Sequence, residues 1–245
     1  MIKQAFSMQD RLKTVCLVAN TAFTLLNFRK ELIATLVSQG YRVVAVSPAD
    51  CSFLPGQNIK EQFASLGVDF VRCDFSRLGT NPISDLKSMY SLYEIFVQLK
   101  PDVVLNYTVK PTIYGSLAAG FAGIKVIASN ITGAGSILTA RTGMKNKILT
   151  KVLFVLYRAS LKRNTVVFFQ NSDDLKMFKD HNLLGYARTH ILNGSGVDLD
   201  RFKRQSPLPS IPKFLFVGRL LIDKGIWEYV QAAQAVKIKH PHAIF

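Results

Sequence analysis

Two cations near the end of the chain have a spacing that suits the binding of a diphosphate. The apolar run Phe214–Val217 predicts a buried strand that ends at Gly218, so Arg219 leaves the carboxyl end, where open α/β sheets bind ligands. Lys224 stands at the start of the next predicted helix, whose free N–H groups favour an anion. Arg can hold phosphate through two parallel hydrogen bonds, and Lys adds a mobile charge. The alternative is a solvated turn in which both cations pair with acids such as Asp223.

Two earlier predicted strands are also followed by residues that suit a ligand. Thr108 and Lys110 come after Val103–Asn106, and Lys110 is a candidate partner for an acceptor phosphate, with a surface charge beside a helix as the alternative. Gly133 and Gly135 come after the next predicted strand. Glycines there permit either close approach of the backbone to a ligand or a tight turn alone.

The segments that must position these residues alternate between short apolar runs and helical patterns. Strands are predicted at Val15–Ala19, Val43–Ser47, Phe70–Arg72, Val103–Asn106, Val126–Ser129, Val166–Gln170, His190–Leu192 and Phe214–Val217. Helices are predicted at Leu26–Gln39, Ile83–Lys100, Thr112–Ala122, Met144–Leu161 and Ser172–His181, the last with Ser172 as its N-cap. Continuous apolar strands are typical of parallel sheets, so we predict a doubly wound α/β domain with helices on both faces.

A proline-rich polar stretch predicts a boundary between two domains. We expect a first domain over residues 1–202, a linker over 203–212 and the start of a second α/β domain over 213–245. One strand and one helix cannot bury their own apolar faces. We therefore expect the chain to be truncated soon after its second domain begins.

Composition limits the class of protein. An apolar fraction of 49% excludes a disordered chain, and a formal charge of +15 indicates an anionic partner. The three cysteines, Cys16, Cys51 and Cys73, are too few and too far apart for a disulfide framework or a metal cluster, which favours the reducing cytoplasm. Cys16 lies in an apolar run and is expected in the core. We predict no transmembrane segment and no signal peptide.

Two segments of the sequence resemble a known family. Gly218-Arg219-Leu220 with Lys224-Gly225 looks like the donor-phosphate motif of the family-4 retaining glycosyltransferases, which have the two-domain GT-B fold. The segment Gly194–Phe202 resembles that family's Asn-Gly-Val-Asp-x-x-x-Phe motif. The resemblance implies that Arg219 and Lys224 hold the donor diphosphate and stabilise charge on the leaving nucleoside diphosphate.

Further segments resemble one branch of the family, which acts on lipid-linked sugars in bacterial O-antigen and capsule assembly. These are Thr108–Ser116 and Ile131–Gly135, which includes Thr132. The resemblance implies a nucleotide-sugar donor, usually a UDP-sugar, an undecaprenyl-diphosphate-linked acceptor, no cofactor, and a position on the inner face of the cytoplasmic membrane.

The sequence departs from the family pattern in three places. The loop after the first strand, in which Asn20 is a candidate ligand-binding residue, lacks the glycine pair that approaches the donor phosphates. No histidine lies near Ser129–Gly135, and the four histidines are expected to be structural or solvated. The family's Glu-x7-Glu pair falls beyond Phe245, so this chain by itself is expected to transfer little or no sugar.

A long basic segment predicts contact with a membrane. The stretch 141–164 contains no acid, and four of its cations share one face of a helix: Lys147, Lys151, Arg158 and Lys162. A basic stripe beside apolar flanks suits anionic lipid headgroups, with a solvated domain helix as the alternative.

Other classes of function remain as alternatives. A nucleic-acid-binding or anionic-surface-binding protein without catalysis would explain the calculated pI of about 9.9, but we find no binding motif, and nucleic acid is not expected as a partner. A dinucleotide-dependent oxidoreductase is disfavoured because the first loop lacks Gly-x-Gly-x-x-Gly. A non-enzymatic relic is the remaining possibility.

Overall fold

The computed structural model describes residues 13–49, 58–75, 81–133, 144–204, 211–218, 220 and 222–245. The chain divides into two compact units, Met1–Gly196 and Val197–Phe245. This division falls before the predicted linker.

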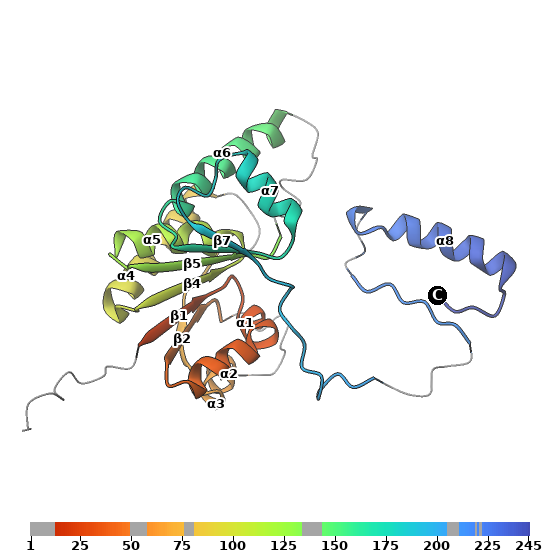
Figure 1. Cartoon of the computed structure of the whole chain (residues 1–245), viewed down its shortest axis with the longest axis horizontal. Coiled ribbons are helices and arrows are strands. Elements are labelled where there is room, and N and C mark those ends of the chain that lie inside the picture. Colours follow the sequence, from red (N-terminus) through yellow and green to blue (C-terminus); the bar gives the residue numbers. More distant parts are fainter. Residues whose placement is uncertain are drawn as a thin grey trace, which may run out of the picture. The chain divides into compact units, whose positions relative to one another are not determined.

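The first unit is built on one parallel sheet of seven strands (Figure 1). The strands are β1 (Thr14–Val18), β2 (Arg42–Ser47), β3 (Asp69–Arg72), β4 (Val103–Tyr107), β5 (Val126–Ile131), β6 (Val166–Phe169) and β7 (Arg188–Ile191). Their order is β3-β2-β1-β4-β5-β6-β7, and every ladder is parallel. The predicted α/β class, the parallel sheet and seven of the eight strand positions are confirmed.

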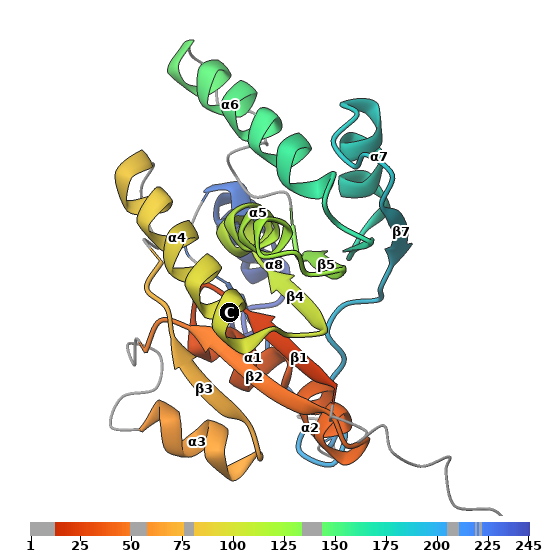
Figure 2. The ribbon, with the colours of Figure 1, turned by 90° about the vertical axis from the view of Figure 1, so that its left-hand side faces the viewer.

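Helices cover both faces of this sheet, as predicted (Figure 2). One face carries α1 (Ala22–Phe28), α2 (Lys30–Ser38) and α3 (Ile59–Ser65). The other carries α4 (Pro82–Leu99), a π-helical turn η1 (Pro111–Gly115), α5 (Ser116–Phe121), α6 (Met144–Leu161) and α7 (Ser172–Asp180). Each layer buries its own apolar cluster because side chains on a strand alternate between the two faces. All five residues of β1 are buried, including Cys16.

Four helical segments differ from the prediction. The single helix predicted at Leu26–Gln39 is wrong: the chain breaks at Arg29, whose ψ of 7° is not helical, into α1 and α2. The short helix α3 was not predicted. The segment predicted as Thr112–Ala122 begins with the π-helical turn η1. The N-cap of α7 is Asn171, not Ser172, because the Asn171 side chain accepts from the Asp174 N–H.

A buried polar network joins β4, β5, α5 and the end of α6. Asn106 Nδ2 donates to Ser116 Oγ at 3.2 Å, and Asn164 Nδ2 donates to the same hydroxyl at 2.9 Å. Ser129 Oγ lies 3.2 Å from Ser116 Oγ. Gly115 passes so close to the Asn106 amide that a Cβ there would overlap Asn106 Oδ1. Glycine is therefore required by the close approach of η1 to β4.

The second unit does not contain the predicted strand Phe214–Val217. Its described residues form one parallel bridge, Lys213 with Ile244, a 3₁₀ turn η2 (Ile222–Lys224) and the helix α8 (Ile226–Lys239). A strand needs a neighbouring strand to satisfy its backbone groups, and a single bridge does not provide one. Phe214, Leu215 and Val217 consequently remain exposed.

Candidate functional site

The site predicted from the first unit lies at the carboxyl edge of the sheet. Strand order reverses between β1 and β4, and open α/β sheets bind ligands in the crevice beyond such a switch point. Asn20, half-buried, follows β1, and Thr108 and Lys110 follow β4. Thr132 and Gly133 follow β5, the next strand along this edge. The topology therefore brings the predicted donor- and acceptor-binding residues of the first unit to one edge of the sheet, as the sequence predicted.

The same edge carries buried polar atoms with no hydrogen-bond partner among the described residues. The atoms at or just beyond the ends of β4, β5 and β6 are Thr108 Oγ1, Asn130 Oδ1 and Gln170 Nε2. Unpaired buried polar groups are rare in folded proteins because each costs free energy, and a bound ligand can supply the partner. Sequence reasoning missed Asn130 and Gln170, although a polar residue that ends an apolar strand was the signal that could have identified them.

Thr108 also has an unfavourable backbone conformation. Its φ of 71° lies in the left-handed region, which a β-branched residue rarely adopts. Strain of this kind persists only where the surrounding structure enforces it, and it is frequent at ligand sites. The turn from β4 into η1 is therefore held in a shape that the Thr108 side chain itself does not favour.

Lys110 is held by an acid from the neighbouring helix α4. Its Nζ lies 2.6 Å from Asp85 Oδ1, and Tyr114 Oη donates to Asp85 Oδ2 at 2.9 Å. Burial, followed by the hydrogen bond to Asp85, raises the pKa of Tyr114. The Lys110 side chain keeps 19% of its exposure. A phosphate that used Lys110 would therefore share it with Asp85.

The glycines after β5 are only partly covered by the structure. Gly133 has a φ of 152°, and nothing lies within 4 Å of the place where a Cβ would be. Its conformation therefore suits glycine, and no described residue fills the space beside it. Gly135 lies outside the described residues.

A cation that the sequence did not single out lies at the switch point. Arg29, at the break between α1 and α2, is 7% exposed. Its Nη1 donates to Ser195 Oγ at 2.8 Å, and its guanidinium carbon lies 4.4 Å from the centroid of the Tyr107 ring. Tyr107 ends β4, and Ser195 follows β7, so this cation joins three separate segments at the edge of the sheet. The sequence pattern did not indicate a buried role for Arg29, because it predicted this residue to lie inside one continuous helix.

The donor motif of the second unit is partly described. Lys224 is exposed in η2, directly before α8, so its predicted place near a helix N-terminus is confirmed. Gly218 is exposed, and among the described residues the Phe216 ring lies near the place of a Cβ. Arg219 lies outside the described residues, and its predicted contact with a diphosphate stays a prediction.

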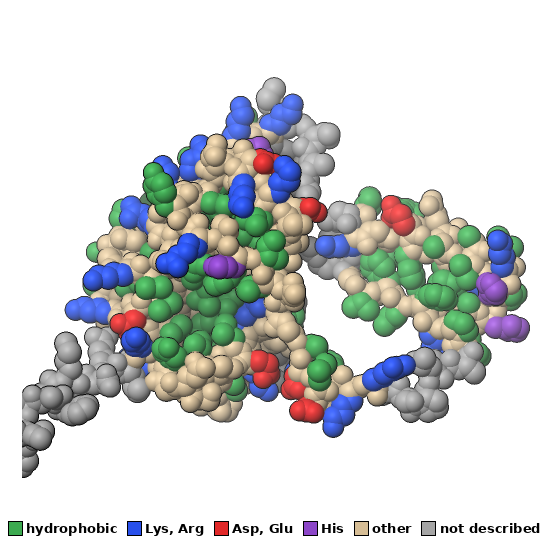
Figure 3. Space-filling model, viewed as in Figure 1, with side chains coloured by type: hydrophobic (Ala, Val, Ile, Leu, Met, Phe, Trp, Pro, Cys, Tyr) green, Lys and Arg blue, Asp and Glu red, His purple; other side chains and the backbone are tan. Residues whose placement is uncertain are grey.

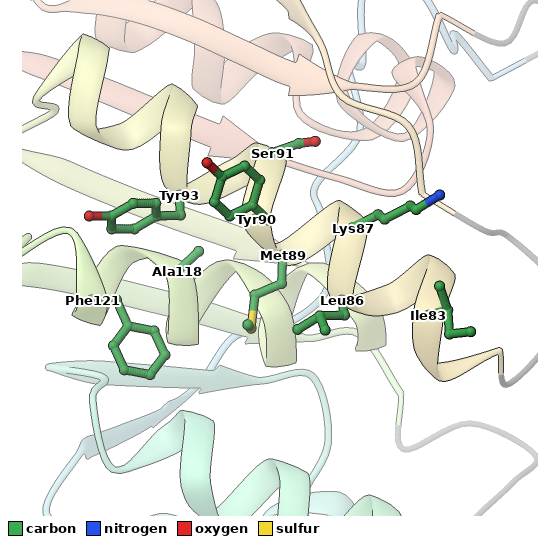
Figure 4. A pocket seen from close by; sticks show the side chains of 9 residues that line it. All are labelled: Ile83, Leu86, Lys87, Met89, Tyr90, Ser91, Tyr93, Ala118 and Phe121. Atoms are coloured by element: carbon green, nitrogen blue, oxygen red, sulfur yellow. The ribbon is translucent and has the colours of Figure 1, made fainter.

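The first unit also carries a large open groove. It encloses about 930 Å³ between α4 and α5 and is lined by Ile83, Leu86, Lys87, Met89, Tyr90, Ser91, Tyr93, Ala118 and Phe121 (Figure 4). Lys87 is the one charged residue in this lining. A groove this apolar does not suit a diphosphate.

The basic stripe predicted on α6 lies on the surface of the first unit. Lys147, Lys151, Arg158 and Lys162 are all exposed, and Figure 3 shows Lys and Arg side chains over the part of the unit where α6 lies. Beside the stripe, α6 exposes an apolar row: Ile148, Val152 and Val155. Arg158 is engaged within the fold, since its guanidinium donates to the carbonyls of His181 and Asn182. None of the helices in the described residues is long and apolar enough to cross a bilayer.

Metal chemistry finds no support in the described residues, where no group of three or more His, Cys, Asp or Glu side chains is placed to hold an ion. Cys16 and Cys73 are buried, and burial raises the pKa of the Cys73 thiol to about 12. Both thiols are therefore protonated at neutral pH and inert as nucleophiles.

The fold is that of known GT-B proteins. The chain superposes on sucrose-phosphate synthase from Thermosynechococcus elongatus with a TM-score of 0.67, at 13% identity over 91% of this chain and 60% of that one. A glycosyltransferase from Rickettsia africae superposes with a TM-score of 0.57, at 15% identity over 93% of this chain and 58% of that one. A UDP-N-acetylglucosamine 2-epimerase from Rickettsia bellii superposes with a TM-score of 0.55, at 14% identity over 96% of this chain and 61% of that one. The class is therefore an α/β protein of the GT-B type, and the fold alone does not separate transferases from epimerases.

The sequence decides the family. Residues 14–171 match the model of the glycosyl transferase 4-like family, and the chain belongs to that family. A curated relative is the N,N'-diacetylbacillosaminyl-diphospho-undecaprenol alpha-1,3-N-acetylgalactosaminyltransferase of Campylobacter jejuni, 23% identical over 237 residues. The match covers 91% of this chain and 60% of that relative.

Proposed function

We propose that this chain belongs to a glycosyltransferase that moves a sugar from a nucleotide-sugar, of the UDP-sugar type, to an acceptor linked to undecaprenyl diphosphate. The observation that carries the proposal is the family match over 14–171, which spans the sheet edge where polar groups without partners gather. The printed activity of the Campylobacter relative supplies the acceptor class. Retention of the anomeric configuration is proposed from the family resemblance.

The proposal assigns the two substrates to the two units. The acceptor would bind at the carboxyl edge of the first unit, where Lys110 is the candidate partner for its phosphate. Asn20, Thr108, Thr132, Gly133 and Gly135 would contact the donor or the acceptor. The donor diphosphate would bind Arg219 and Lys224 of the second unit, beside Gly218. Charge that develops on the leaving diphosphate would be stabilised by these fixed cations.

Acceptor binding can be tested directly with this chain. We expect saturable binding of a short-chain polyprenyl diphosphate that carries an N-acetylhexosamine, because all seven strands of the first-unit sheet are formed and its carboxyl edge carries Thr108 and Lys110. Equilibrium dialysis with labelled acceptor would measure binding by this chain. Transfer of label from UDP-sugars to the same acceptor would test the reaction in a form of the protein that also contains the family's Glu-x7-Glu region. If the sugar-bearing lipid neither binds nor accepts sugar, the proposed function is wrong.

The high positive charge supports a second candidate, a nucleic-acid- or anionic-surface-binding protein without catalysis. Binding to duplex DNA and to anionic vesicles, each measured from low to high salt, would separate the two. Tight, strongly salt-dependent binding to DNA without any acceptor binding would favour the second candidate.

We also propose that the enzyme works at the inner face of the cytoplasmic membrane and docks through α6. Its apolar row, Ile148, Val152 and Val155, lies beside the basic stripe, and this pairing suits an anionic lipid surface. A lipid-linked acceptor requires the enzyme to reach that surface.

Replacing Lys147, Lys151 and Lys162 by Gln is expected to weaken binding to anionic vesicles about a hundredfold. Each cation near such a surface contributes roughly 1 kcal/mol, which sums over the three. Arg158 is left in place because it also holds the turn after α7. The matched control is Lys13, Lys30 and Lys60 to Gln, which removes the same charge outside α6. Sedimentation with phosphatidylglycerol vesicles measures the difference, and equal loss in both variants would exclude α6 as the docking helix.

A further inference from the structure

Arg29 is a buried cation whose charge no described acid balances. The residue is 7% exposed, and no carboxylate of the described residues lies within ion-pair distance of it. A guanidinium carries five N–H donors, and one of them, on Nη1, is used by Ser195 Oγ. Its Nε is buried without a partner. Burial lowers the pKa of Arg29, which reflects the cost of keeping this charge out of water.

The surroundings of Arg29 lie at the switch point of the sheet, where open α/β folds bind ligands. The Tyr107 ring beneath the guanidinium ends β4, and β4 neighbours β1 at the switch point of the sheet. Ser195 lies between Gly194 and Gly196, which have φ of 80° and 76°. These two glycines let the segment after β7 turn sharply and bring the Ser195 hydroxyl to Arg29. Figure 1 shows this segment passing α1 after it leaves β7.

We propose that Arg29 is an anion-binding residue that takes a diphosphate group at the switch point, with Ser195 and the Tyr107 ring as the supports that orient its guanidinium. Arginine suits this ligand because its planar fork can bind phosphate oxygens through two parallel hydrogen bonds. The ring fixes the plane of the fork, and the hydroxyl fixes its rotation. An incoming diphosphate would supply the negative charge that no described residue provides.

The proposal deepens the proposed function, on which it rests for the identity of the ligand. Both substrates of that function contain a diphosphate, one in the nucleotide-sugar and one in the lipid carrier. Inorganic pyrophosphate is therefore the probe for the shared chemistry. UDP and farnesyl diphosphate are the probes that separate the two sources.

The test is isothermal titration of this chain with the three probes. Arg29→Met keeps the length of the side chain and removes its charge, and it is expected to weaken pyrophosphate binding about tenfold or more. Arg42→Met is the matched control, because Arg42 is an exposed cation paired with Asp69 at the amino end of β2. This variant is expected to bind pyrophosphate as the parent does. Loss of UDP binding in Arg29→Met would assign the donor, and loss of farnesyl diphosphate binding the acceptor.

A purely structural role for Arg29 predicts a different pattern. Ser195→Ala removes the hydrogen bond but leaves the charge, so it is expected to weaken pyrophosphate binding no more than about threefold. If Ser195→Ala and Arg29→Met lose binding equally, Arg29 only clamps the segment after β7. Unchanged binding in Arg29→Met, or no binding by the parent chain, would also overturn the proposal. If circular dichroism shows that Arg29→Met does not fold, Arg29→Lys is used in its place. Lysine keeps the positive charge but lacks the planar fork of the guanidinium. The Arg29→Lys variant is therefore expected to bind pyrophosphate several-fold more weakly than the parent.

The outcomes are independent of the test of the proposed function. Acceptor binding and sugar transfer depend on the sugar and the lipid, whereas pyrophosphate contains neither. A transferase in which Arg29→Met binds pyrophosphate normally would refute this inference alone.

Discussion

In a form of the protein that transfers sugar, Arg219→Ala and Lys224→Ala are each expected to lower kcat about a hundredfold or more. The physical reason is that the leaving nucleoside diphosphate gains charge as the glycosidic bond breaks, and loss of one fixed donor to such a group costs about that much. Because Lys224 is exposed and lies directly before α8, its loss should leave folding intact. The measurement is initial-rate transfer from a labelled UDP-sugar to a lipid-diphosphate acceptor.

Lys237→Ala is the matched control for these two variants. Lys237 is also an exposed cation of the second unit, but it lies in the last turn of α8, where its Nζ donates to the Pro241 carbonyl. We expect its kcat within about twofold of the parent, as for a surface change away from the reaction. Near-normal turnover in Arg219→Ala or Lys224→Ala would contradict the role assigned to that residue. Circular dichroism of each variant separates lost chemistry from lost folding.

Gly115→Ala is expected to lower the free energy of unfolding of the first unit by about 2–3 kcal/mol. The added Cβ would overlap Asn106 Oδ1, and Asn106 cannot move away because it is fully buried and bonded to Ser116. Relief would require displacement of η1 from β4, which would also disturb the turn that carries Thr108 and Lys110. Equilibrium urea unfolding followed by circular dichroism measures the change.

Gly120→Ala provides a control with a similar overlap but a movable neighbour. A Cβ at Gly120 would meet Arg163 Cδ, yet Arg163 is exposed and can swing away. Its guanidinium would leave the Phe121 ring, over which it lies at 4.6 Å, at a cost of about 0.5–1 kcal/mol. Replacing glycine by alanine inside α5 stabilises the helix by about 1 kcal/mol, because alanine has the higher helix propensity. The free energy of unfolding should therefore change little, and an equal loss in both variants would show that the Asn106 contact is not the cause.

The sequence by itself determined the class of fold and most of its elements. Strands buried on both faces must be apolar throughout, so runs such as Val43–Ser47 were identifiable without any tertiary information. Alternation of these runs with helical patterns then required a parallel sheet covered on both faces. The positions of Thr108, Lys110 and Gly133 after strands followed from the same alternation, because parallel strands end at one edge.

Elements that depend on a neighbour were predicted less well. The strand expected at Phe214–Val217 is not formed, since its described surroundings supply only the Lys213–Ile244 bridge. The break at Arg29 also escaped detection, because local propensity favours a continuous helix there. A side chain that reaches the Tyr107 ring and the Ser195 hydroxyl, 166 residues away from Arg29, leaves no local periodic signal.

The partners of the site residues were decided by the tertiary structure alone. Lys110 was identifiable as a cation after a strand, but its pairing with Asp85 depends on how α4 packs beside η1. Asn130 and Gln170 are polar residues at the ends of apolar strands, and the tertiary structure adds that their buried side-chain atoms have no partner among the described residues. Local periodicity in the sequence shows where each strand ends, and therefore which residue types lie at those ends. Pairing, burial and unbalanced charge arise between segments far apart in the chain, so they exist only once the sheet has brought those segments together.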